Sequence, residues 1–91
     1  MGRRAVEAEW GDFSDRLALR LRILRERSNL SQEDVAYRAG ITRYTYQRLE
    51  KGVTRHGDPV NPTLRSLIAI AQALGVGLHE LIPDELPDLR P

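Results

Sequence analysis

A three-residue turn between two short helical segments constrains this chain more than any other feature of its sequence. The turn consists of Gly40, Ile41 and Thr42. A glycine just after a helix commonly takes the left-handed conformation, so Gly40 marks the end of a helix over 32–39. Thr42 is an N-cap residue type and marks the start of a helix over 43–51. We expect the two helices to form one compact unit, with Ile41 as an apolar plug beneath the turn.

Three further helices are predicted around this helix-turn-helix unit. The first runs over 13–27, because Asp12 is an N-cap residue type and apolar residues follow it at helical spacing. Its inward face is expected to consist of Leu17, Leu21 and Leu24.

Residues 1–12 leave two conformations open. Val6 and Trp10 continue the apolar stripe of the first helix, so that helix could start near Arg4. Gly11 would cost about 1 kcal/mol inside a helix, which argues against the extension. The segment is therefore either a helix extension or docked arm, or it is disordered.

The fourth and fifth predicted helices complete an all-α fold. Asn61 as the cap and Pro62 at the first helical position would open a helix that ends at Gly75. A last short helix is expected over 78–82. The inward residues of the fourth helix, by spacing, are Leu64, Leu67, Ile70, Ala71 and Leu74.

Length and cysteine content bound the function. A chain of 91 residues supports one domain with a modest core, not a core together with a deep catalytic cavity. It contains no cysteine, which excludes disulfides, thiol catalysis and cysteine-ligated zinc and fits a cytoplasmic protein. The longest apolar run, 67–71, is too short to span a bilayer, so no membrane partner is expected.

The net charge of +1 is divided unevenly along the chain. Residues 13–82 hold eleven Arg or Lys against seven Asp or Glu, whereas 83–91 hold three acidic residues and one Arg. A basic body suits a phosphate-binding surface, although many solvated domains share this pattern. We divide the chain into an N-terminal arm or helix extension (1–12), a helix-turn-helix domain (13–82) and an acidic, proline-containing tail (83–91) that we expect to be frayed.

Several spaced motifs in residues 21–82 resemble the phage-repressor (Cro, or xenobiotic-response-element) helix-turn-helix family. They are LR at 24–25, LSQEDVA at 30–36, AGITR at 39–43, LEKG at 49–52, NPTL at 61–64 and AQALGVGLHELI at 71–82. The resemblance implies a compact five-helix, lambda-repressor-like bundle that binds duplex DNA, usually as a homodimer on a palindromic operator. One departure is the long segment 53–61, where family members have only a few residues. That segment could follow the phosphate backbone or be a plain solvated loop.

The second helix of such a unit, 43–51, is the recognition helix, whose N-terminal part enters the major groove. Its outward residues are Arg43, Tyr44 and Arg48, with Gln47 nearby. Arginine can donate two hydrogen bonds to guanine, and a tyrosine ring can lie on a thymine methyl group. We predict that Arg43 and Tyr44 read bases, against the alternative of merely solvated helix charges.

Four more residues are predicted to contact DNA, mainly at the backbone: Gln32, Thr42, Thr45 and Arg55. Gln32 resembles the family's glutamine, which clamps a phosphate at the N-terminus of the preceding helix. The alternative is a helix-favouring surface residue. Thr42 and Thr45 can offer hydroxyl groups to phosphates, although Thr42 is also needed as a cap.

Other prominent side chains are interpreted as structural. Arg25 and Glu50 match the family's ion pair between the first helix and the recognition helix, and the resemblance implies that role here. Tyr46 falls on the inner face of the recognition helix. His56 and His79 are too few and too isolated for a metal site, and no metal or cofactor is expected.

The sequence therefore predicts a transcriptional regulator, in the simplest form a repressor that occupies its operator. The alternative is a protein-interaction module, such as the antitoxin of a toxin-antitoxin pair, with a protein partner. Because no nucleophile-base arrangement, phosphate loop or nucleotide fingerprint is present, we do not expect an enzyme.

Leu19 and Ile23 form an apolar pair on the side of the first helix opposite its inner face. One interpretation is an ordinary exposed patch. The others are that 1–12 or 83–91 folds over the pair, or that it joins a subunit contact.

Overall fold

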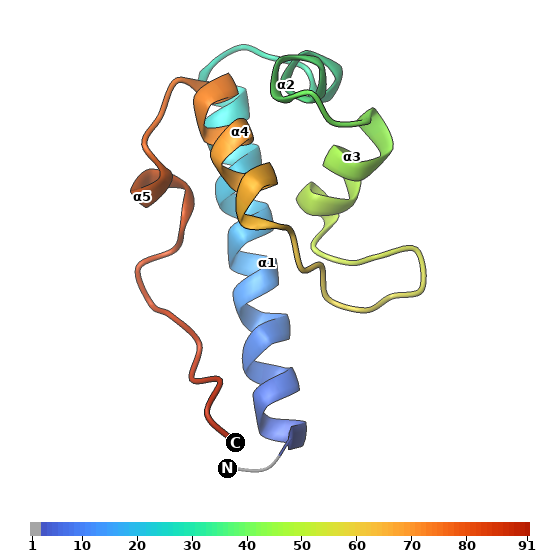
Figure 1. The fold of residues 1–91 in the computed structure, drawn as a ribbon, viewed down its shortest axis with the longest axis vertical. Coiled ribbons are helices and arrows are strands. Elements are labelled where there is room, and N and C mark those ends of the chain that lie inside the picture. The colour runs from blue at the N-terminus through green and yellow to red at the C-terminus, as the bar shows by residue number, and fades with distance from the viewer. Residues whose placement is uncertain (1–2) are drawn as a thin grey trace.

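The computed structural model describes residues 3–91, which form five helices (Figure 1). These are α1 (Arg3–Arg27), α2 (Gln32–Ala39), α3 (Arg43–Lys51), α4 (Leu64–Leu74) and α5 (Leu78–Leu81). Extended pairing within 3–91 is limited to an isolated antiparallel bridge between Val53 and Pro59. The expected five-helix, all-α fold class is confirmed. Over the same residues, no helix combines the length and apolar character that a membrane span requires.

Local capping fixes both ends of α2 and the start of α3. The Ser31 hydroxyl accepts from the Asp34 N–H at 3.0 Å, and the Asp34 carboxylate accepts from the Ser31 N–H at 2.9 Å. Gly40 ends α2 at φ 71°, a left-handed conformation that suits glycine. Thr42 then opens α3, because its hydroxyl accepts from the Thr45 N–H at 3.0 Å. These bonds satisfy backbone groups that every helix end leaves unpaired.

Each helix contributes to one core. α2 packs on α3 and α4, while α1 packs on α3 and α5. Each helix places at least one fully buried side chain in this core, among them Leu21, Val35, Tyr46, Ile70 and Leu81. The prediction for Leu64 was wrong, since this residue is exposed; it is the first residue of α4, where the helix has only begun to pack on the core.

α1 is longer than the 13–27 segment predicted from its leucines. It runs without interruption from Arg3 through Gly11 and Asp12, so Asp12 is not an N-cap. Its 25 residues correspond to about 38 Å of helix, close to the 40 Å longest dimension of the molecule. Long-range contacts support the extension: the Trp10 indole N–H donates to the Val60 carbonyl at 3.0 Å. Residues 1 and 2 of the proposed arm lie outside the described residues.

α4 begins two residues later than the sequence suggested. Thr63, rather than Asn61, is the N-cap, and its hydroxyl accepts from the Ser66 N–H at 3.0 Å. Pro62 therefore precedes the cap instead of opening the helix, and it favours extended backbone at Asn61. α5 likewise ends at Leu81, one residue earlier than predicted.

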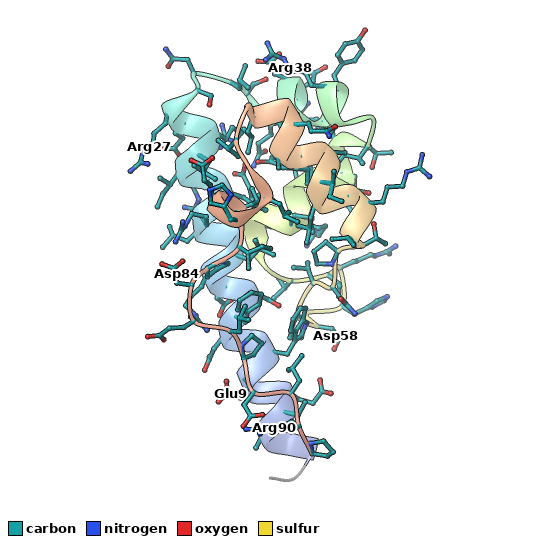
Figure 2. All side chains as sticks on the ribbon, turned by 60° about the vertical axis from the view of Figure 1, so that its left-hand side comes forward. Glu9, Arg27, Arg38, Asp58, Asp84 and Arg90 are labelled. Carbon is teal, nitrogen blue, oxygen red and sulfur yellow. The ribbon has the colours of Figure 1, made fainter. Side chains whose placement is uncertain are left out.

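The tail 83–91 runs back along α1 towards the N-terminus, as both views show (Figures 1 and 2). Pro83 is buried, and Glu85 lies 3.8 Å from Arg16 of α1. Leu89 lines the same hollow as Val6 and Trp10. The tail keeps an extended course beside α1, although Leu86 and Leu89 remain exposed, so fraying of this segment stays a prediction.

Candidate nucleic-acid interface

α3 presents polar side chains outward because its opposite face is buried. Tyr46, Leu49 and Glu50 point into the core, and Tyr46 is fully buried. On a helix, this leaves Tyr44 and Arg48 on the outer side, while Arg43 is the first residue of α3 and lies at its N-terminal end. Arg43 and Tyr44 are both exposed at the N-terminal end of α3, and 52% of the Tyr44 surface is accessible. This is the end that a recognition helix presents to base edges.

Tyr44 and Arg48 are stacked one turn apart on this outer face. The Arg48 guanidinium carbon lies 5.2 Å from the centre of the Tyr44 ring. The contact combines cation-π attraction with the usual i, i+4 proximity on a helix. It restrains two long side chains before any ligand is present, which lowers the entropy that binding would remove.

A groove of about 450 Å³ separates α3 from the α3–α4 loop and the start of α4. Three predicted DNA contacts of α3 lie along one wall: Tyr44, Thr45 and Arg48. Arg55 of the loop lies along the other, together with His56. The structure therefore places Arg55, in the loop that directly follows α3, across the groove from the outer side chains of the recognition helix.

Thr42, Gln47 and Gln32 occupy other parts of this face. The Thr42 hydroxyl donates to the Thr45 hydroxyl at 2.8 Å in addition to capping α3. Gln47 is half-buried. Gln32 lies at the N-terminus of α2, and its amide nitrogen donates to Glu50 at 3.1 Å. The side chain predicted to clamp a phosphate is thus also part of an internal network, which sequence spacing alone did not indicate.

Arg25 and Glu50 form a two-bond ion pair between α1 and α3. Arg25 Nε donates to Glu50 Oε2 at 2.6 Å, and Arg25 Nη2 donates to Oε1 at 3.0 Å. Their side chains are only 15% and 4% exposed. Arg25 Nη1 also donates to the Leu30 carbonyl at 2.9 Å, which ties the α1–α2 connection to the same group.

The protonation of Glu50 follows from this arrangement. Burial alone would raise the pKa of Glu50, but the hydrogen bonds it accepts, led by those from Arg25, hold its pKa below the ordinary value of 4.5. The same hydrogen bonds raise the pKa of Arg25. Burial, followed by the nearby Glu50 carboxylate, raises the pKa of Tyr46. Its hydroxyl lacks a well-aligned partner within residues 3–91 and stays neutral.

Sequence reasoning missed several residues of the groove. Its floor and far wall include Thr54, Asn61, Thr63 and Ser66. Thr63 is an N-cap residue type and precedes Ser66 by three residues. This signal could have placed the start of α4, and with it these hydroxyl groups, at the groove. Over residues 3–91, no three His, Cys, Asp or Glu side chains gather in a way that could hold a metal ion.

Comparisons with known proteins match this geometry. The helix-turn-helix domain family matches residues 16–82. The chain is 39% identical over 66 residues to an uncharacterized HTH-type transcriptional regulator, y4dJ, of Sinorhizobium fredii, covering 70% of this chain and 78% of that protein. It also resembles the crystal structure of the restriction-modification controller protein C.AhdI from Aeromonas hydrophila, with a TM-score of 0.65 and 29% identity. That match covers 76% of this chain and 96% of the controller.

The family match takes in all five helices except the N-terminal part of α1. It therefore includes the turn at Gly40, the recognition helix α3 and the ion pair that holds it. The resemblance drawn from the sequence motifs is confirmed. The chain therefore belongs to the helix-turn-helix domain family, as a DNA-binding protein of the phage-repressor or Cro type.

Proposed function

We propose that the chain is a cytoplasmic transcriptional regulator that binds a palindromic operator as a homodimer and represses by occupying it. The single observation that carries this proposal is the outer face of α3. Arg43 and Tyr44 are exposed at its N-terminal end, while its inner face is fixed in the core. Both relatives described above are named as a regulator or a controller protein, which agrees with this role.

Each exposed side chain then has a distinct task. Arg43 donates to guanine and Tyr44 packs on a thymine methyl group, so both discriminate between bases. Gln47 and Arg48 lie one turn further along α3 and extend this contact. Gln32 bonds a phosphate at the N-terminus of α2, where backbone N–H groups and the helix dipole also favour an anion.

Three residues anchor the backbone around α3. They are Thr42, Thr45 and Arg55. Phosphate contacts of this kind set the register of the recognition helix but carry no sequence information themselves.

The test is selection of bound sequences from a random duplex pool, followed by affinity measurements on the best site. A symmetric consensus is expected, because a two-fold dimer reads two equivalent half-sites. Arg43→Ala should cost about 1–3 kcal/mol of binding and relax the preference at one or two base pairs. Gln32→Ala should weaken binding to all sequences nearly alike.

Arg27→Ala is the matched control, since Arg27 is an exposed arginine of α1 that is not among the residues assigned to DNA (Figure 2). It should leave the selected consensus unchanged. If Arg43→Ala also leaves both affinity and consensus unchanged, the register assigned to the recognition helix is wrong. If the parent protein selects no sequence at all, operator binding itself is wrong.

A further inference from the structure

The N-terminal part of α1 is bonded to the loop that follows the recognition helix. The Val60 carbonyl accepts two hydrogen bonds from α1, one from the Trp10 indole N–H at 3.0 Å and one from the Ser14 hydroxyl at 3.1 Å. Ser14 and Val60 are both buried. The family match begins at residue 16, so both donors lie outside the part of the chain that the family shares.

Trp10 also lies beside both the loop and the tail. It lines one hollow with Asp58 and Pro59 of the loop and with Leu89 of the tail. Its ring centre lies 5.6 Å from that of Phe13, which is buried. One side chain of α1 thus bonds to the loop and borders a hollow that it shares with the tail.

The loop is closed at its base and carries its basic side chain at its tip. At the base, the Val60 N–H donates to the Gly52 carbonyl at 3.0 Å, and Val53 pairs with Pro59. The Thr54 N–H then donates to the Asp58 carbonyl at 2.7 Å. These bonds leave residues 55–57 as an exposed tip.

The tip and the recognition helix border one groove, as described above for Arg55, Tyr44 and Arg48. A duplex that seats α3 in its major groove places sugar-phosphate backbone on either side of that helix. The tip is therefore on the side of α3 where a backbone strand must pass, and it offers a guanidinium group suited to phosphate.

We propose that the N-terminal part of α1 holds the α3–α4 loop as a second DNA-contacting element, with Trp10 as the positioning residue and Arg55 as the group that binds a backbone phosphate. The inference rests on the operator binding proposed above and adds to it. It assigns a function to the N-terminal extension of α1. The helices within the family match do not need this extension for their own packing.

The proposal is tested through the salt dependence of DNA binding, which counts phosphate contacts. Each lost contact lowers the slope of log K against log salt by about 0.9 and weakens binding roughly fivefold near 0.15 M salt. Arg55→Ala should show this change on the selected operator. The double variant Trp10→Phe with Ser14→Ala keeps the ring but removes both donors to Val60, and it should lower the slope by a similar amount.

Combining all three substitutions should give no further loss of slope, because the anchor acts only through Arg55. Trp10→Phe alone replaces the double variant if the latter does not fold, and Arg27→Ala should leave the slope unchanged. A purely structural role for Trp10 would lower the melting temperature without altering the slope.

Three outcomes would overturn the proposal: an unchanged slope for Arg55→Ala, an unchanged slope for the anchor variants, or fully additive losses in the triple variant. All three can occur while the parent protein still selects its operator and Arg43→Ala still relaxes the consensus. The anchoring role of Trp10, and with it the phosphate contact assigned to Arg55, can therefore fail while operator binding through α3 stands.

Discussion

Glu50 lies on the recognition helix, yet its carboxylate is bound by side chains from both preceding helices. Arg25 of α1 donates two hydrogen bonds to it and Gln32 of α2 donates one. A carboxylate that is 4% exposed is stable in the charged form only when such donors replace the water it has lost. The charge of Glu50 is therefore a structural requirement of the packing of α3 on α1 and α2.

We expect this charge to make the free energy of unfolding depend on pH. Because the folded pKa of Glu50 is lower than its ordinary value of 4.5, its ionised form favours the folded state above that pH. The stabilisation is lost as the pH falls below 4.5 through the folded pKa. Glu50→Gln should therefore lower the free energy of unfolding at pH 7, on the order of 3–5 kcal/mol if Arg25 stays buried without its partner.

The difference between the parent and Glu50→Gln should shrink as the pH is lowered, since a protonated glutamate resembles glutamine. Denaturant unfolding of both proteins at pH 7 and near pH 3 measures this difference in the free energy of unfolding. Glu33→Gln, at an exposed position on α2, should change the free energy of unfolding little at either pH. A Glu50→Gln protein as stable as the parent at pH 7, yet unable to bind DNA, would show that Glu50 acts on DNA directly.

α1 is continuous through a glycine that helix propensity disfavours. Gly11 lies inside the helix, and a Cβ atom built on it would meet only Pro59 Cγ, at 3.6 Å. This is an ordinary van der Waals separation, so the position has room for a methyl group. The helix is held there by its contacts with the loop instead of by the intrinsic preference of its residues.

Gly11→Ala should therefore stabilise the protein, by about 1 kcal/mol, because alanine has the higher helix propensity and loses less backbone entropy on folding. Gly40→Ala is the matched control. Its φ of 71° is left-handed, so the same substitution should destabilise by about 1–2 kcal/mol although nothing lies within 4 Å of the new atom. Thermal melting of the two variants should show shifts of opposite sign; a lower melting temperature for Gly11→Ala would contradict the account of α1.

Local signals predicted the elements whose ends are fixed by neighbouring residues. Ser31, Gly40 and Thr42 act within a few residues of themselves, and the structure has their caps as expected. The extent of α1 depends instead on the bond from Trp10 to Val60, fifty residues away, and no local pattern encodes that contact.

The candidate site likewise combines features that local sequence signals predict with features that depend on the folded structure. Exposure of Tyr44 follows from helical periodicity and the burial of Tyr46, whereas Arg43 is exposed as the first residue of α3. The bond between Gln32 and Glu50 requires the packing of α2 on α3, and the position of Arg55 depends on how the loop after α3 folds back.

At the scale of the whole molecule, the surface retains an apolar patch on α1. Leu19 and Ile23 are 52% and 37% exposed. The tail borders this patch with Pro83, Asp84 and Glu85 but does not cover it. The tail therefore covers the pair only in part in the single chain. Of the interpretations offered by the sequence, a subunit contact becomes the more specific prediction.

We predict that Leu19→Glu with Ile23→Lys converts the proposed homodimer into folded monomers. The substituted side chains are already half-exposed in the single chain, so the protomer should keep its core. Sedimentation measures the change in mass, and thermal melting at a concentration where the parent is monomeric checks the fold. Tyr37→Ser is the control. It removes a large exposed side chain from α2 instead of α1 and should leave the mass unchanged.

An unchanged dimer with unchanged melting would make the patch ordinary exposed surface. A double variant that melts at a lower temperature as a monomer would show instead that the patch packs within the chain.

The triple attachment of Glu50 has a thermodynamic consequence for association with DNA. Since α1, α2 and α3 are joined through one carboxylate, the recognition helix reaches the duplex already ordered and in a fixed orientation. Association then loses rigid-body motion and some side-chain freedom, but no backbone has to fold. Its heat-capacity change should be small, without the large negative value that accompanies coupled folding. Differences in affinity between operators then report base contacts and the cost of deforming each DNA sequence.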